Sequence, residues 1–340
     1  MRKFIALILL FLCFQINECT ADIISIKAYK EAISYLETHA VTDLDIGTVR
    51  MKPLELLSIL HAMPVGSSLH FITKWNGITV CSEDTELNLR DASYKDYTVE
   101  DIEALIELMP NLTKIDVSNN RKFSSKIMIP LVEKYPKISF NWLIILNSTH
   151  SLSTWSTAYS SYNEPNDENK LTSEQLEMLK YAQNIKALDL GHNAITSLDF
   201  LEYLPDLELL ILGDNPIEDG TPISKLKHLK YLELFSVKIS DVSFLSNCTE
   251  MIDLNLSHNK EITDLTALDN MLLLERFWGN RMTGINKEEE ARFVSAHPTT
   301  KIVFHGAHAT SDGWREHERY DHYRWCFRHH KWIPFGEKLE

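Results

Sequence analysis

The chain has 340 residues, of which 44% are hydrophobic, and a formal net charge of −14 at pH 7. This is the composition of an ordinary globular protein, and the length allows a sizeable core. The acidic balance makes the chain a poor candidate for binding nucleic acid or anionic lipid through bulk charge.

Residues 1–21 have the form of a secretory signal peptide. A short basic start is followed by 11 unbroken apolar residues from Phe4 to Phe14, and small residues precede Asp22. This run is too short to span a bilayer as a folded helix, so we expect cleavage after Ala21, with a retained anchor as the alternative. No other segment could cross a membrane. We therefore expect a secreted or cell-surface protein whose mature chain is not inserted in a membrane.

Three cysteines remain beyond this segment, Cys81, Cys248 and Cys326, with no CxxC pair. Three distant cysteines do not make a disulfide framework. Cys248 falls at an inward position of a repeat, which predicts a small buried hydrophobic side chain.

The first half of the chain shows helical periodicity. Apolar residues at helical spacing predict an N-terminal cap over residues 22–84. Residues 85–146 form longer units that each contain a helix, a proline and a strand. Thr98, followed three residues later by Asp101, predicts a capped helix start. Residues 147–170 are different, because Ser, Thr and Asn supply 13 of the 24 positions. They predict a long loop that interrupts the stack, and this loop either carries binding determinants or is a passive insertion.

Residues 171–304 contain four stretches that align on one another at a spacing of 22 to 23 residues: Ile185–Asp206, Leu207–His228, Leu229–Glu250 and Met251–Leu273. Each begins with an LxL core whose alternation predicts a strand with one buried face. The apolar residues that follow stand three apart, which favours short 3₁₀ turns over a long helix. Stacking such units would join their apolar edges into one core and align the strands as a parallel sheet.

One position of the repeat is an asparagine in three units, Asn193, Asn215 and Asn259, and a valine in the other, Val237. An amide at this position can hydrogen-bond the backbone at the bend after the strand. In the following segment, Gly279-Asn280 comes about two residues early, which predicts a distorted last repeat with an uncertain strand register.

The C-terminal residues 305–340 hold six of the 14 histidines and three of the seven tryptophans. We interpret them as a cap that covers the last repeat. The alternatives are an aromatic recognition patch or a metal site built from His305, His308, His317 and His322. In the string from His317 to His322 the second histidine stands five residues on. The zinc-protease motif needs a spacing of four on one helix face, so the match fails on geometry. We expect no metal and no cofactor.

Strand alternation also predicts which side chains face outward on the concave side. Eight of them form the predicted binding site: Leu209, Ile211, Tyr231, Glu233, Phe235, Asp253, Asn255 and Trp278. Large apolar groups that adjoin one another and are ringed by polar groups are typical of an interface. Asp189, Asp214, Glu233 and Asp253 would supply an acidic rim. Two alternatives stay open: the C-terminal residues fold back over these side chains, or the chain self-associates.

The strings "LKYAQNIKALDLGHNAITSLDFL", "LELLILGDNPI", "LKYLELFSVKISDVSFL" and "GWREHERY" resemble secreted bacterial leucine-rich repeat proteins, related in their repeats to the internalin type. The resemblance covers residues 85–320. It implies an α/β fold: a leucine-rich repeat solenoid with a curved parallel sheet, a helical N-terminal cap and an aromatic and His-rich C-terminal cap. It also implies a surface or secreted protein that binds another macromolecule.

No GxSxG, GxxxxGK[ST] or paired CxxC pattern is present, so we expect a protein that is not an enzyme. The function that follows is binding of a protein or glycan on the concave sheet face. The alternatives are an enzyme-associated module with a His-rich metal site and a structural component of the cell envelope.

Overall fold

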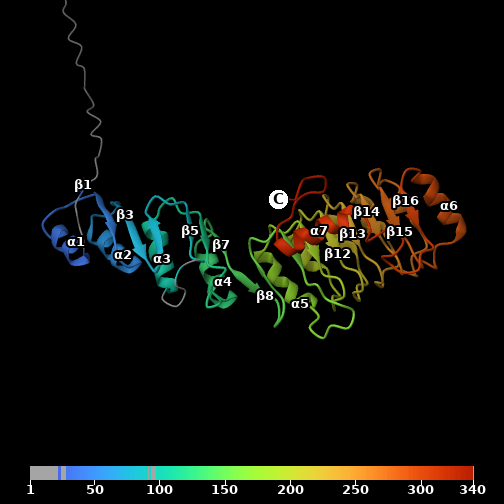
Figure 1. Ribbon diagram of the computed structural model, residues 1–340, viewed down its shortest axis with the longest axis horizontal. Helices are drawn as coiled ribbons and strands as arrows, with labels where there is room; N and C mark the ends of the chain where they lie inside the picture. The colour runs from blue at the N-terminus through green and yellow to red at the C-terminus, as the bar shows by residue number, and fades with distance from the viewer. Residues whose placement is uncertain (1–21, 24–27, 91, 93–96, 340) are drawn as a thin grey trace, which may run out of the picture. The chain divides into compact units, whose positions relative to one another are not determined.

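The computed structural model describes residues 22–23, 28–90, 92 and 97–339. The predicted signal peptide lies outside these residues. The chain divides into two compact units: residues 1–116 with 137–139, and residues 117–136 with 140–340. Each unit has its own elements, which Figure 1 labels.

The first unit combines two small sheets with helices. One sheet has the order β1-β2-β3-β4, with β1 (Asp22–Ile23), β2 (Asp43–Val49), β3 (Ser68–Trp75) and β4 (Ile78–Cys81). Strands β1 to β3 are parallel, and β4 is antiparallel to β3. The helices are α1 (Tyr29–Leu36) and α2 (Pro53–Ala62). The N-terminal cap is therefore not only helical as predicted, since residues 43–81 contribute three strands.

The second part of this unit contains β5 (Glu86–Asn88), α3 (Val99–Leu108) and β6 (Lys114–Asp116), with β5 parallel to β6. The predicted start of α3 is confirmed. Thr98 Oγ1 accepts a hydrogen bond from the backbone N–H of Asp101 at 3.3 Å, and Asp101 accepts one from the N–H of Thr98 at 3.0 Å. This reciprocal pair satisfies two backbone donors that the helix itself leaves free.

The second unit begins with α4 (Ser125–Lys134), and β7 (Ser139–Asn141) lies at the boundary between the units. A hairpin of β8 (Leu143–Ile145) and β9 (Ser151–Ser153) follows. The main sheet has seven parallel strands: β10 (Ala158–Ser160), β11 (Ala187–Asp189), β12 (Leu209–Ile211), β13 (Tyr231–Glu233), β14 (Asp253–Asn255), β15 (Arg276–Trp278) and β16 (Lys301–Val303). Strands β9 and β10 lie inside residues 147–170, so the prediction of one long loop there is wrong.

The return segments confirm the predicted 3₁₀ turns. After the short helix α5 (Ser173–Leu176) come η1 (Glu177–Tyr181), η2 (Asp199–Tyr203), η3 (Thr221–Lys225), η4 (Ser243–Asn247) and η5 (Thr266–Leu268). Two longer helices close the unit, α6 (Lys287–Ala296) and α7 (Glu318–His329). The parallel sheet and its stacked turns confirm the predicted α/β solenoid.

The predicted asparagine position forms a ladder between neighbouring repeats. Asn215 Nδ2 donates to the carbonyl oxygens of Leu190 and Leu212 at 2.8 and 2.9 Å, and Asn259 Nδ2 donates to those of Leu234 and Leu256 at 2.7 and 2.9 Å. Asn259 Oδ1 also accepts a hydrogen bond from the N–H of Val237 at 3.0 Å. The neighbouring asparagine thus satisfies a backbone donor in the repeat that has valine at this position. The amides therefore satisfy backbone groups that the bend removes from the sheet.

The strand register runs unbroken to the end of the sheet. Arg276, Phe277 and Trp278 pair with Asp253, Leu254 and Asn255 and continue to Lys301, Ile302 and Val303. The prediction of an uncertain register in the last repeat is therefore wrong. Asn280 does come early, and it serves another purpose, because its side chain bonds the backbone of His308 and Gly306 in the C-terminal residues.

Replacing Leu232 with alanine tests the core of the solenoid. The Leu232 side chain has no exposed surface and pairs in register with Leu210 and Leu254. We expect the free energy of unfolding to fall by about 2–5 kcal/mol, the range for emptying a packed site. Denaturant unfolding followed by circular dichroism measures it. Leu272→Ala is the control, since Leu272 is 86% exposed; equal losses in both variants would mean that the core is assigned incorrectly.

Candidate functional site

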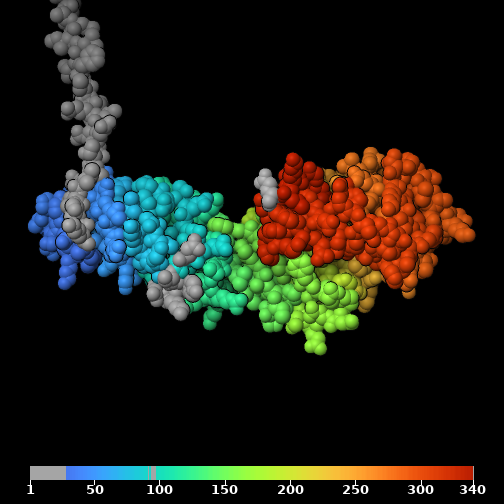
Figure 2. Space-filling model, in the orientation of Figure 1, coloured from blue at the N-terminus to red at the C-terminus, as the bar shows by residue number. Residues whose placement is uncertain are grey.

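The concave side of the sheet in the second unit is covered by the C-terminal segment, which we define as residues 305–339. One apolar cluster joins sheet residues such as Leu209, Tyr231 and Trp278 to Trp314, Phe327 and other residues of this segment. Figure 1 shows α7 lying across the strands, and Figure 2 shows the segment as the red surface over them. Strand alternation had predicted that Leu209, Ile211 and Tyr231 face this side, and their place in the cluster agrees.

Exposure, however, differs from the prediction. All eight predicted site residues are between 0% and 7% exposed: Leu209, Ile211, Tyr231, Glu233, Phe235, Asp253, Asn255 and Trp278. They do not form a solvent-exposed patch, and Tyr231 is a buried member of the apolar cluster. The alternative in which the C-terminal residues fold back over the face is the arrangement found. The physical reason is that the segment carries matching chemistry, both apolar and charged.

Glu233 lies at the centre of the covered face and is fully buried. Arg315 donates to both of its carboxylate oxygens at 2.7 Å, and Trp314 Nε1 donates to it at 3.0 Å. The hydroxyl of Tyr231 also donates to it, at 2.5 Å. A buried carboxylate is tolerated only with such partners.

Asp253, also fully buried, is neutralised in the same way. Arg276 of the neighbouring strand donates to its two oxygens at 2.8 and 2.7 Å, and Arg319 of α7 adds a third bond at 2.8 Å. Asn255 Nδ2 donates to the carbonyl oxygen of Ala309 at 2.9 Å, and Trp278 Nε1 donates to that of Ser311 at 2.8 Å. Each of these polar groups of the covered face thus has a partner in the segment or the sheet.

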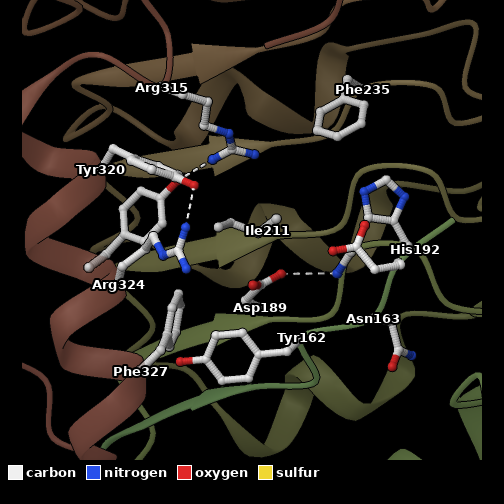
Figure 3. Close-up of a pocket in the computed structure, with 13 residues that line it drawn as sticks. Tyr162, Asn163, Asp189, His192, Ile211, Phe235, Arg315, Tyr320, Arg324 and Phe327 are labelled. Carbon is white, nitrogen blue, oxygen red and sulfur yellow. Dashed lines mark hydrogen bonds between the residues drawn. The ribbon is translucent and has the colours of Figure 1, made fainter. Parts of the chain in front are cut away.

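An open cavity of about 260 Å³ remains where the segment does not fill the concave side. It lies between the sheet and α7 and is lined by Tyr162, Asp189, Ile211, Phe235, Arg324 and Phe327, among others (Figure 3). Ile211 and Phe235 belong to the predicted site, and Asp189 belongs to the predicted acidic rim. Sequence reasoning missed Tyr162 and Arg324, because the first lies in the segment taken for a loop and the second in the segment taken only for a cap.

Asp189 is half-buried beside this cavity. Ser160 Oγ donates to one carboxylate oxygen at 2.8 Å, and the N–H of Gly191 donates to the other at 3.1 Å. Burial is the main reason that the pKa of Asp189 is raised, and the nearby Glu233 adds to it; the bond from Ser160 and the charge of Arg315 oppose the shift. A raised pKa beside a cavity is a common property of a functional group.

Substituting Asp189 with asparagine tests this electrostatic cost. The folded pKa lies above the ordinary 3.8, so the folded state prefers the protonated carboxyl. Stability is therefore lost as the pH rises from the unfolded pKa to the folded one, and the loss persists at neutral pH. The uncharged amide can keep both hydrogen bonds, because its oxygen accepts from Gly191 and its NH₂ group donates to the Ser160 hydroxyl. We expect Asp189→Asn to raise the melting temperature by a few degrees near neutral pH.

The gain in that variant should shrink as the pH is lowered, because the wild-type carboxyl then takes up its proton. The titratable side chains around Asp189 include Tyr159, Tyr162, His192, Glu233, Arg315 and Arg324. They are identical in both proteins, so the difference between the two melting curves isolates Asp189. A melting temperature lowered by the substitution at every pH would contradict a destabilising carboxylate.

The C-terminal histidines have other partners than a metal. His322 Nε2 lies 2.7 Å from the carbonyl oxygen of Ile333, and His305 Nε2 lies 3.1 Å from Glu290. His317 accepts from the N–H of Arg319 at the start of α7. In the part of the chain that the structure describes, no three His, Cys, Asp or Glu side chains are grouped to hold a metal ion.

The cysteines among the described residues, Cys81, Cys248 and Cys326, are all free thiols. Cys248 is fully buried as predicted, and burial raises its pKa to about 11, so it stays protonated at neutral pH. None of the helices in the described ranges is long and apolar enough to cross a membrane.

Comparison with known proteins gives one family match and several similar solved structures. A family model described as leucine-rich repeat matches residues 181–198. Among solved structures, internalin C2 of Listeria monocytogenes is 22% identical, with a TM-score of 0.34 over 46% of this chain and 76% of that one. Internalin InlF of the same organism is 13% identical, with a TM-score of 0.36 over 84% and 73%. A leucine-rich repeat protein of Leptospira interrogans is 18% identical, with a TM-score of 0.36 over 77% and 71%. No curated protein sequence matches significantly.

Proposed function

We propose that this chain is a binding protein that takes a protein partner at the open end of its concave side. The observation that supports this most directly is the open cavity, which is the part of that side left free by the C-terminal segment. Ile211 and Phe235 line it, so these two residues of the predicted concave site keep a small exposed surface there, 4% and 7%. The other six are occupied by the segment, which already supplies the aromatic and arginine groups that a partner would bring.

Tyr162 is the residue we expect to contribute most to partner binding. It is 51% exposed at the edge of the cavity, and its backbone lies in the left-handed region with φ of 51°. The same conformation recurs at the matching position of the following repeats, for example at His192 and Asp214, so it belongs to the turn after the strand and sets the direction of the Tyr162 side chain. The N–H of Tyr162 donates to Ser160 Oγ at 3.1 Å, and this serine also bonds Asp189. The tyrosine is therefore held in place beside the carboxylate.

A binding function is tested by comparing matched variants against extracellular proteins. Wild type, Tyr162→Ala and Leu272→Ala are immobilised, and the retained proteins are identified by mass spectrometry. We expect one protein to be retained by wild type and by Leu272→Ala and to bind Tyr162→Ala at least about tenfold more weakly, as for an aromatic hot spot. Loss of that protein in Leu272→Ala alone would move the site away from the cavity. Equal retention of the protein by wild type and both variants would mean that Tyr162 and the cavity do not take part in its binding.

We also propose that the chain is exported and that residues 1–21 are removed. The support is the short basic start and the apolar run before Asp22. Mass spectrometry of exported protein should find Asp22 as the first residue. An intact Met1 on the exported chain would contradict this.

A further inference from the structure

The carboxylates of Asp189, Glu233 and Asp253 lie on the concave side and differ in whether a cationic side chain is paired with them. Glu233 and Asp253 each have an arginine within 2.8 Å. Asp189 has no oppositely charged side chain within 4.0 Å among the residues that the structure describes. In the part of the chain that the structure describes, its carboxylate accepts hydrogen bonds from a serine hydroxyl and a backbone N–H. A partly buried carboxylate without a cation is costly, so its site suits a ligand that supplies one.

Arg324, on the opposite wall of the same cavity, is a cation without a carboxylate partner among the described residues. It projects from α7, and its Nη1 donates to the Tyr320 hydroxyl at 2.8 Å. Within the described ranges no carboxylate lies within 4.0 Å of its guanidinium. Figure 3 shows the side chains of Asp189 and Arg324 pointing into one space. Asp189 and Arg324 thus face the same ligand position, while Glu164, which also lines the cavity, is exposed.

The remaining lining is mixed, because apolar and aromatic side chains alternate with the polar ones of Asn163, His192 and Arg315. Ile211, Phe235 and Phe327 line the cavity, and the ring of Tyr162 stands at its edge (Figure 3). A concave site where apolar surfaces and convergent polar groups meet suits a small polar ligand with an apolar side chain. The volume of about 260 Å³ holds a ligand of the size of one or two amino acids.

We propose that this cavity binds a small zwitterion with a free ammonium group and a free carboxylate, either an α-amino acid or a very short peptide with an apolar side chain. The ammonium group pairs with Asp189, whose two oxygens are held by Ser160 and Gly191. The carboxylate pairs with the guanidinium of Arg324, which can bind both of its oxygens. The apolar side chain packs on Ile211 and Phe235.

This inference goes beyond the proposed function and does not depend on it. A protein partner is tested by retention of a macromolecule, whereas a zwitterion is tested by titration of the isolated chain. Failure of one test therefore leaves the other intact. If both succeed, competition between the small ligand and the partner shows that they share the cavity.

The experiment is isothermal titration calorimetry of the full chain with L-leucine, L-phenylalanine and the dipeptide L-leucyl-L-leucine. The same amino acids are tested as N-acetyl derivatives, which lack the ammonium group, and as amides, which lack the carboxylate. We expect binding of a free zwitterion with a Kd of about 1 mM or tighter, and at least tenfold weaker binding of both derivatives. Preference for the amino acid or for the dipeptide identifies the source of the zwitterion.

Two variants test which side chain binds each charged group of the ligand. Asp189→Asn keeps a hydrogen-bonding partner for Ser160 and should weaken zwitterion binding at least tenfold while removing the discrimination against the N-acetyl derivative. Arg324→Gln should do the same for the amide. Arg328→Gln is the matched control, because Arg328 lies one turn further along α7, is exposed and does not line the cavity. It should bind as wild type does.

Three results would overturn the proposal. The first is no measurable binding of any of the three zwitterions at millimolar concentration. The second is equal affinity for the free and the blocked compounds, which would mean that the ammonium and carboxylate groups of the ligand do not contribute to binding. The third is unchanged or tighter binding by Arg324→Gln, which would mean that Arg324 only offsets the charge of Asp189.

Discussion

Replacing Asp253 with alanine is expected to lower the free energy of unfolding by about 3–5 kcal/mol, the cost of removing one partner from a buried ion pair. Asp253 has no exposed surface and receives hydrogen bonds from Arg276 and Arg319. Its removal leaves Arg276, which is 4% exposed, without its carboxylate. Arg319 also loses the bond that joins α7 to β14. Denaturant unfolding of both proteins measures the difference.

Asp206→Ala is the control for this substitution. Asp206 forms an ion pair with Lys186 at 3.0 Å, but the side chain of Asp206 is 60% exposed. Exposed pairs contribute about 0–1 kcal/mol, so this variant should unfold almost as wild type does. If Asp253→Ala were equally mild, the C-terminal segment would not be held on the sheet by this charge.

The repeats of the second unit could be predicted because one pattern satisfies several requirements at once. Leu210, Leu232 and Leu254 alternate with outward residues and lie in register on neighbouring strands. The asparagine after the strand bonds the backbone of the preceding unit. These are local or nearest-neighbour interactions, which a fixed sequence period encodes directly.

Strand β10 could not be predicted in this way. Ala158, Tyr159 and Ser160 stand in a stretch rich in Ser and Thr, which favours a loop on composition. They form a strand because Ala187–Asp189 offers an edge with which they pair. Three residues are too few for a period, and the pairing partner decides the outcome.

The direction of the concave side chains was predictable, but their coverage was not. Alternation places Glu233 and Asp253 on that side, and only tertiary contact shows that Arg315 and Arg319 reach them, 82 and 66 residues further along the chain. A signal was present in the sequence. Acidic residues repeat on the sheet, and arginines and aromatic residues gather in "GWREHERY" near the C-terminus. That signal is compositional and does not specify which pairs form.

The open cavity follows from the same arrangement. The repeat pattern placed Asp189 at the acidic rim. Among the residues that the structure describes, it has no cationic partner because the C-terminal segment does not bring an arginine within ion-pair distance of it. Arg324 and Phe327 reach the cavity because α7 presents residues three and four positions apart on one face. No feature of either sequence segment alone identifies this site.

Truncation before Gly313 is expected to destabilise the second unit more than any single substitution. It removes the side chains of Trp314, Tyr323 and Phe327, each no more than 2% exposed, and bares Tyr231 and Trp278 on the sheet. Burying one such side chain contributes about 1.5–3 kcal/mol, so the loss should exceed about 5 kcal/mol, which is the total stability of many domains.

The truncated chain should therefore melt at a much lower temperature, or fail to fold, and should bind the dye ANS at its exposed apolar face. Removal of the last three residues alone is the control, because Lys338 and Leu339 are exposed. Thermal unfolding by circular dichroism and ANS fluorescence measure the two effects. A truncated chain that melts as wild type does, without added ANS fluorescence, would mean that the segment is dispensable and that the whole concave side is open to a partner. A chain that loses stability assigns the segment to the core of the fold, which leaves the cavity beside α7 as our proposed site for binding on that side.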